Sequence, residues 1–230
     1  MTDVSENPFK GFPTAATRFF KELAQNQDRS WSAEHKAEHE QFVKTPMSAL
    51  QQAVTARLAS TPLLLTGDPK RSMFCINRDV RFSSDKSPYK TNASGIWSRD
   101  GSKTSPGLVY FQFGAGEIFA AAGFYMPMPE DLHRLRAGMA WDAQGWLSVR
   151  KALDRQGLAL MTEGALGRVP KSFESSAAVL HGDLRLKSWA VSRSFPLRVA
   201  RSPELVEAIG ELALSCADLL EFGWSALEAA

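Results

Sequence analysis

The residues best suited to chemistry lie in one polar run, Arg78 to Lys90, which reads RDVRFSSDKSPYK. Arginine presents a planar fork of donors that matches phosphate or carboxylate, and lysine adds a mobile point charge. The run therefore predicts a loop that binds a small anionic or phosphorylated ligand. The expected ligand-binding residues of this loop are Arg78, Arg81, Lys86 and Lys90.

Two aspartates and a tyrosine in the same run are candidates for catalysis. Asp79 and Asp85 could orient the cations or transfer protons, and Tyr89 offers a phenol that can donate a hydrogen bond. In the structural alternative, pairs of the type Arg78–Asp79 or Arg81–Asp85 hold the loop to its neighbours and bind no ligand. These residues leave both interpretations open, and they do not establish whether the protein is an enzyme.

The basic excess of the chain is concentrated around this run. The net charge is +2 over 230 residues, whereas segment 68–103 holds eight lysines and arginines against four aspartates, a net charge of +4. A near-neutral total does not favour a nucleic-acid-binding surface spread over the protein. The alternative from another class is therefore local: a nucleic-acid or protein interaction module in which Phe82 and Tyr89 lie between cations.

A second group, His35, Glu38 and His39, fits the H-x-x-E-H pattern of inverted zinc peptidases. Two histidines four residues apart on a helix share a face and could bind Zn²⁺, with Glu38 as the base. Short patterns of this kind also arise by chance in helices rich in Glu, Lys and His. A zinc hydrolase is therefore a minor alternative, and we predict no metal and no cofactor.

Other residue groups give weaker indications. Arg134 and Arg136 cannot face the same side of a helix, so at most one of them joins a site. Gly114–Gly116 separates two predicted strands and is expected to form a turn rather than a phosphate loop. The serines of the polar run have no neighbouring histidine to activate them, which argues against a serine nucleophile.

The elements that must position the polar run predict an α+β fold. Helical periodicity is expected in segments that begin near residues 14, 32, 46, 129, 142 and 202, with Pro46 as a break or kink. Extended segments are expected at residues 73–77, 93–97, 108–113, 117–125 and 186–195. Several of these strands are joined by connections too short for a crossover helix. The pattern therefore favours a largely antiparallel central sheet flanked by N- and C-terminal helices.

Length and composition predict a single domain. Residues 1–8 are expected to be a flexible N-terminus, and residues 9–230 to form one α+β domain. No segment reads as a membrane span or a signal peptide, so we expect a cytoplasmic protein. Cys75 and Cys216 lie far apart and are expected to be reduced thiols. The oligomeric state is not predicted.

The run from Arg78 to Lys90 also resembles the signature R-D-x-R-F-x-x-D-K-x-P-Y-K of an uncharacterised bacterial and fungal family, domain of unknown function 2461. The resemblance covers about residues 9–220 and includes an N-x-x-R-x-W segment, a hairpin followed by a helix, and two C-terminal blocks. Lys187 lies in the last block, and we expect it to reach the same site. The resemblance implies the fold and the site residues, but it names no reaction.

The chain departs from the family pattern at three places. Cys75 stands where an arginine is usual, and residues 176–178 stand where an Asp-His-Pro stretch is expected. His39 stands where a tyrosine is usual, which argues against zinc at the second group.

Overall fold

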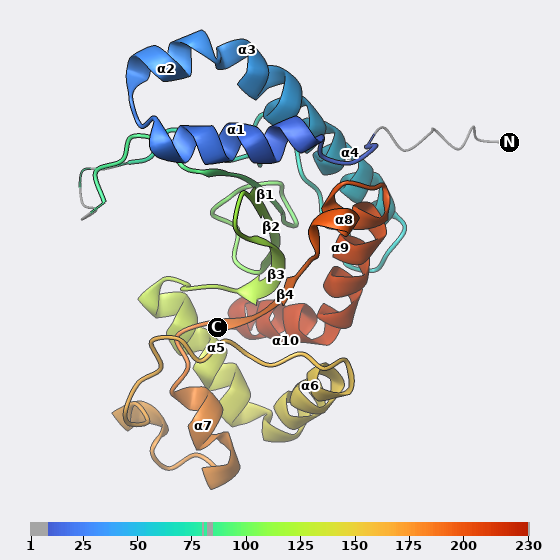
Figure 1. The fold of residues 1–230 in the computed structure, drawn as a ribbon. Coiled ribbons are helices and arrows are strands. Elements are labelled where there is room, and N and C mark those ends of the chain that lie inside the picture. The colour runs from blue at the N-terminus through green and yellow to red at the C-terminus, as the bar shows by residue number, and fades with distance from the viewer. Residues whose placement is uncertain (1–8, 80, 82–84, 230) are drawn as a thin grey trace, which may run out of the picture. The chain divides into compact units, whose positions relative to one another are not determined.

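The structure is a computed structural model that describes residues 9–79, 81 and 85–229 (Figure 1). The segment predicted to be flexible, residues 1–8, lies outside the described residues. The fold is α+β with one four-stranded antiparallel sheet, in which each strand pairs with the next along the chain. The strands are β1 (Asn92–Trp97), β2 (Leu108–Gly114), β3 (Ile118–Phe124) and β4 (Trp189–Ser194). The single-domain α+β class predicted from the sequence is confirmed.

Helices precede, interrupt and follow the strands. The N-terminal helices are α1 (Thr14–Gln25), α2 (Arg29–Glu34), α3 (Lys36–His39) and α4 (Thr45–Ala59). The helices between β3 and β4 are α5 (Pro129–Trp141), α6 (Ala143–Arg155) and α7 (His181–Leu184), with two 3₁₀ turns at Lys171–Phe173 and Ala178–Leu180. The C-terminal helices are α8 (Leu197–Ala200), α9 (Glu204–Ser215) and α10 (Ala217–Glu228). Among the described residues, no helix has the length and apolar character needed to cross a membrane.

Within this fold the described residues group into two compact units. The first unit comprises Met1–Lys103, Tyr110–Ala120 and Ser194–Glu211. The second unit comprises Thr104–Val109, Ala121–Arg193 and Leu212–Ala230. Each unit has its own aromatic core.

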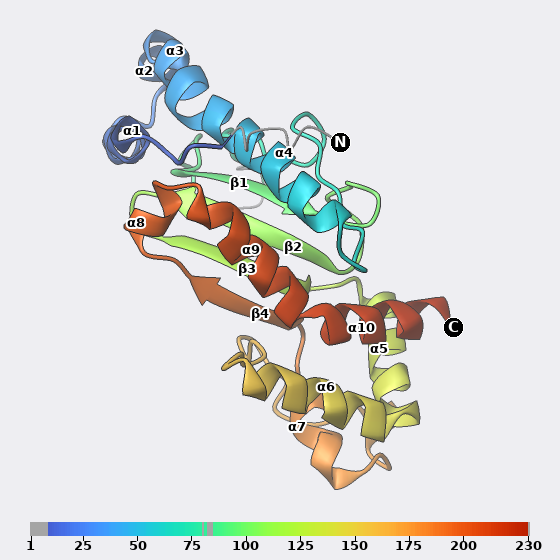
Figure 2. The same cartoon turned by 90° about the vertical axis from the view of Figure 1, so that its right-hand side faces the viewer.

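The core of the first unit lies on the helix-covered face of its strands. Phe111 and Phe113 on β2 are fully buried, and the ring of Phe113 stacks on that of Phe12 with 4.1 Å between centroids. Helices α4 and α9 lie over this face (Figure 2). Tyr110 and Gln112 alternate with the buried phenylalanines and are only half-buried, because successive side chains of a strand point to opposite faces. The sheet therefore has one apolar face against helices and one face with polar side chains.

The core of the second unit is built around two tryptophans. The rings of Trp146 and Trp189 pack with 4.3 Å between centroids, and both side chains are fully buried. Trp146 Nε1 donates a hydrogen bond of 2.7 Å to Asp183, which also pairs with Arg150. The carboxylate thus ties α6 to α7 at the rim of this core.

The predicted break at Pro46 takes the form of a π-turn. Residues Glu40–Lys44 form this turn between α3 and α4, and Pro46 lies in the first turn of α4. A proline is tolerated there because the first N–H groups of a helix have no partner within it. The wider π-turn just before the proline lets the chain continue in nearly helical form.

The C-terminal helical segment differs from its prediction as well. The sequence favours one helix from residue 202, whereas the structure has α9 and α10 joined at Cys216, whose φ of −106° and ψ of 9° leave the helical region. The apolar stripe continues across this joint, which is why periodicity alone does not detect it.

Candidate functional site

The two ends of the signature run lie in an antiparallel hairpin of the first unit. Segment 73–77, predicted as a strand, pairs through isolated bridges, Met73 with Gly95 of β1 and Asn77 with Tyr89. The backbone N–H of Lys90 donates to Ile76 O at 2.8 Å, and that of Arg78 donates to Pro88 O at 2.8 Å. The two ends of the run are therefore held opposite each other by main-chain hydrogen bonds.

The charged residues at the tip pair with one another. Arg78 pairs with Asp85, and Arg81 Nη2 lies 2.7 Å from Asp79 Oδ2. The partners are exchanged relative to the pairs considered from the sequence, because the hairpin brings Asp85 back beside Arg78. The side chains of Arg81 and Asp79 remain 77% and 59% exposed, so this pair adds at most about 1 kcal/mol to stability.

The two aspartates are held in their ionised form. Hydrogen bonds from the Arg81 side chain, and then from its backbone, lower the pKa of Asp79. Hydrogen bonds from the side chain and backbone of Ser87 lower the pKa of Asp85, with a smaller effect from Arg78. A carboxylate with a lowered pKa is a poor proton donor at neutral pH. The geometry thus favours Asp79 and Asp85 as orienting groups, and their predicted role in proton transfer stays a prediction.

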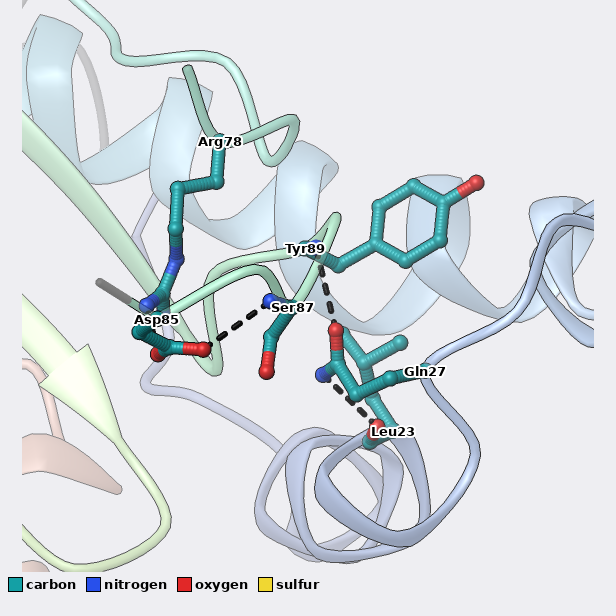
Figure 3. Close-up of polar contacts among 6 residues, drawn as sticks. All are labelled: Leu23, Gln27, Arg78, Asp85, Ser87 and Tyr89. Carbon is teal, nitrogen blue, oxygen red and sulfur yellow. Dashed lines mark hydrogen bonds and ion pairs between the residues drawn. The ribbon is translucent and has the colours of Figure 1, made fainter. Parts of the chain in front are cut away.

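Tyr89 anchors the hairpin to the end of α1. Its backbone N–H donates to Gln27 Oε1 at 3.0 Å, and Gln27 Nε2 donates to Leu23 O at 2.9 Å. The residue is only 8% exposed, and its ring points away from Arg78 and Asp85 (Figure 3). Tyr89 therefore has little surface on which a nucleobase could stack.

Several predicted residues have no defined place in a site. Phe82, Ser83 and Ser84 lie outside the described residues, so stacking by Phe82 stays a prediction. Lys86 is exposed at the tip. Lys187 is half-buried and belongs to the second unit, and its predicted role in the site is likewise untested.

One described residue of the signature run, Lys90, lines a pocket. This pocket has a volume of about 250 Å³ and lies on the polar face of β1 and β2, the face opposite to α4 and α9. We call it the sheet-face pocket. It is lined by Phe74, Lys90, Asn92, Ser94, Tyr110 and Gln112.

Two lysines lie near the ring of Phe74, which forms one wall of the sheet-face pocket; Lys90 itself lines the pocket, and Lys103 lies beside it. The Nζ atoms of Lys90 and Lys103 each lie 5.2 Å from the centroid of the Phe74 ring. Among the described residues, neither ammonium forms an ion pair with a carboxylate. A cation–π contact at a partly exposed site contributes about 0.5–1 kcal/mol. The Phe74 ring therefore attracts both ammonium groups, and because the ring has no net charge both groups keep their positive charge. Lys103 and Phe74 were not predicted, because neither belongs to the signature run.

The rest of the pocket wall is polar and neutral. The Tyr110 hydroxyl donates a hydrogen bond of 3.0 Å to Gln112 Oε1. Burial raises the pKa of Tyr110, the charge of Glu117 raises it further, and a hydrogen bond with Ser94 opposes both effects. Tyr110 therefore remains a neutral phenol at physiological pH.

The histidines of the H-x-x-E-H pattern pack against aromatic rings. His35 stacks on Trp31 with 4.0 Å between centroids, and its Nδ1 lies 2.9 Å from Trp31 O. His39 packs against Phe19 at 5.5 Å. Among the described residues, no group of three His, Cys, Asp or Glu side chains could hold a metal ion. These contacts favour a packing role for both histidines, and the zinc alternative gains no support.

The burial of His39 predicts a pH-dependent stability. Burial lowers the pKa of His39 below its ordinary value of 6.5; the charge of Glu40 raises it by a smaller amount, and the charge of Lys44 lowers it. The unfolded chain then binds the proton more readily, so the free energy of unfolding decreases as the pH falls from 6.5 through the folded pKa. We expect His39→Tyr to flatten this slope in melting temperatures measured between pH 7.5 and 5. The exposed His133→Gln should keep it, and an unchanged slope in His39→Tyr would contradict the prediction.

Arg136 is the inward-facing arginine of α5. Its Nη2 donates to Leu186 O at 2.9 Å, and the residue is 8% exposed, whereas Arg134 pairs with Glu130 at the surface. The two arginines thus face different sides of the helix, as predicted. Burial lowers the pKa of Arg136. Through its hydrogen bond to Leu186, Arg136 links α5 to the segment that precedes β4.

Fold and site together define an α+β protein with a basic, polar pocket on one face of an antiparallel sheet. The chain matches the family described as Conserved hypothetical protein (DUF2461) over residues 15–222, and it belongs to that family. The resemblance seen in the sequence is confirmed. Comparisons with curated proteins and with solved structures gave no match. The family description names no activity, so function must be argued from the site.

Proposed function

We propose that the protein binds a small anion in the sheet-face pocket. The observation that carries the proposal is the convergence of Lys90 and Lys103 on the Phe74 ring, with no carboxylate partner among the described residues. The distances place the two ammonium groups at most about 10 Å apart. An anion between them would form charge-assisted hydrogen bonds, each of which contributes about 1.5–3 kcal/mol.

The size of the pocket limits the ligand. Its volume of about 250 Å³ lies below the range of about 300–1,000 Å³ that is usual for drug-sized ligands. Since a water molecule occupies about 30 Å³ of liquid, the pocket has room for roughly eight to ten non-hydrogen atoms. A phosphate or a small phosphorylated or carboxylated compound fits this volume, whereas a whole nucleotide would extend beyond it.

The signature hairpin supports binding by positioning Lys90. Lys90 follows directly on the anchored Tyr89, and its own N–H is bonded to Ile76 O. Arg78 and Arg81 are each paired with an aspartate. They contribute to the basic character of the hairpin near the pocket and make no direct contact with the bound anion. The described residues that line the pocket are a phenylalanine, a lysine, a tyrosine and neutral polar residues, which support binding more than turnover.

Titration with inorganic phosphate tests the proposal. We expect binding in the millimolar range by isothermal titration calorimetry, weakened about tenfold by Lys90→Met or by Lys103→Met, because each substitution removes a charge-assisted hydrogen bond. Lys21→Met, an exposed position on α1, is the matched control and should bind like the wild type. Absence of phosphate and sulfate binding at tens of millimolar, or equal weakening by Lys21→Met, would refute the proposal.

A further inference from the structure

The neutral part of the sheet-face pocket offers hydrogen-bond acceptors as well as donors. The Asn92 side-chain amide has no hydrogen-bond partner among the described residues, so both its carbonyl oxygen and its N–H groups are available. The Tyr110 hydroxyl gives its proton to Gln112, and its oxygen, which also shares a hydrogen bond with Ser94, has two lone pairs and can accept one further bond. A bare phosphate dianion, HPO₄²⁻, carries one P–OH donor and is otherwise an acceptor, so it offers the Asn92 carbonyl a single donor at most. Ligand hydroxyl groups can pair with both the donors and the acceptors of this part of the pocket, because each hydroxyl both donates and accepts a hydrogen bond.

The volume of the pocket also exceeds that of a bare anion. Phosphate has five non-hydrogen atoms, and the pocket has room for roughly eight to ten. The remaining space corresponds to about three to five non-hydrogen atoms, for example three carbons with two oxygens. Of the residues that line this space, Asn92 has no hydrogen-bond partner among the described residues, and Gln112 keeps one amide N–H beyond its bonds with Tyr110 and Glu117, so a purely aliphatic fragment would offer these groups no partner.

We propose that the ligand is a phosphomonoester of a short polyol, with its phosphoryl group at Lys90 and Lys103 and its hydroxyl groups at Asn92, Tyr110 and Gln112. This inference rests on the proposed function, because it assumes that the two lysines bind an anion. It adds the class of the ligand and separates the residues that bind charge from those that select hydroxyl groups. Lys90 and Lys103 set the affinity for every phosphate, whereas Asn92 and Tyr110 set the preference for the hydroxylated one.

Four compounds titrated into the same protein test the inference. Glycerol 3-phosphate and n-propyl phosphate share the phosphoryl group and the three-carbon chain and differ in two hydroxyl groups. Inorganic phosphate and glycerol represent the two parts alone. We expect glycerol 3-phosphate to bind at least about tenfold more tightly than n-propyl phosphate, and glycerol alone to show no measurable binding. Equal affinity for glycerol 3-phosphate and n-propyl phosphate would overturn the inference and leave the anion site in place.

Two variants assign the selection to residues. Asn92→Ala and Tyr110→Phe should each lower the ratio of the two ester affinities at least threefold while leaving the affinity for inorganic phosphate within a factor of two. Lys90→Met should weaken all three phosphates and leave the ratio unchanged. Circular dichroism and melting temperature test whether each variant is folded. If Tyr110→Phe is unstable, the ratio of ester affinities in Asn92→Ala alone tests which residues select the hydroxyl groups. A preserved ratio in folded Asn92→Ala would overturn the assignment, and failure of all three phosphates to bind would remove the proposed function itself.

Discussion

Gln51→Glu is expected to lower the free energy of unfolding by about 3–5 kcal/mol at pH 7, the range for an uncompensated buried charge. Gln51 lies on α4 with no exposed surface, and its Nε2 donates to Ile96 O at 2.5 Å. Two glycines make room for the amide: a Cβ at Gly67 would collide with Gln51 Nε2, and one at Gly95 would lie 2.5 Å from Gln51 Oε1. An introduced carboxylate would place a charged oxygen against the Ile96 carbonyl in a space that admits no rearrangement.

The same substitution should make stability depend on pH in a defined direction. Burial beside a carbonyl oxygen would raise the pKa of the introduced carboxyl in the folded state above its unfolded value of about 4.3. Stability is then retained below pH 4.3 and is lost as the pH rises through the folded pKa. Urea unfolding at pH 4 and pH 7 measures this difference against the wild type.

Gln52→Glu provides the matched control for this change. Gln52 is the next residue of α4 and is exposed, so the same substitution there should change stability by less than about 0.5 kcal/mol. A destabilisation of Gln51→Glu no larger than that of Gln52→Glu would show that the amide is not buried in solution as it is in the structure.

Gly123→Ala should destabilise the protein by about 3 kcal/mol or more, which corresponds to roughly 6–12 °C in melting temperature for a chain of this size. Gly123 lies on β3 with a φ of +127°, a conformation that residues with a Cβ rarely adopt. A Cβ at this position would collide with the Trp189 carbonyl oxygen and lie 2.8 Å from Ala190 Cα. These are backbone atoms of β4, so the clash can be relieved only by separating the two strands.

Gly116→Ala is the corresponding control. Gly116 lies in the turn between β2 and β3, and no atom lies within 4 Å of a Cβ built there. We expect its melting temperature to stay within about 2 °C of the wild type, as for other surface substitutions. Similar unfolding free energies for the two alanine variants would contradict the close approach of β3 and β4 at Gly123.

Local pattern was sufficient for much of the fold. The alternation around Phe111 and Phe113, followed by the Gly114–Gly116 segment, predicts the hairpin of β2 and β3, whose strands begin and end within one residue of the predicted bounds. The start of α6 is equally local, because Asp142 Oδ1 accepts from the Gly145 N–H at 2.8 Å. These features depend on residues within a few positions of one another, where propensity and period dominate.

The site was predicted less completely than the fold. The sequence singles out Lys90 as one of several cations in the signature run, and the structure places Lys90 at the pocket. It does not single out Phe74 or Lys103. The fold brings Lys90 and Lys103 to the Phe74 ring, which lies 16 and 29 residues before them in the chain. The partners of the ion pairs were exchanged for the same reason, since the turn of the hairpin decides which aspartate lies beside Arg78.

The sequence by itself determined the α+β class, the family and the concentration of positive charge between residues 68 and 103. It did so because composition, periodicity and short motifs are properties of neighbouring residues. Only the tertiary structure decided which of those charges face a pocket and which neutralise one another. That outcome depends on strand pairing and on the two faces of the sheet, which place Lys90 beside Phe74 and leave Arg78 and Arg81 paired with aspartates at the hairpin tip.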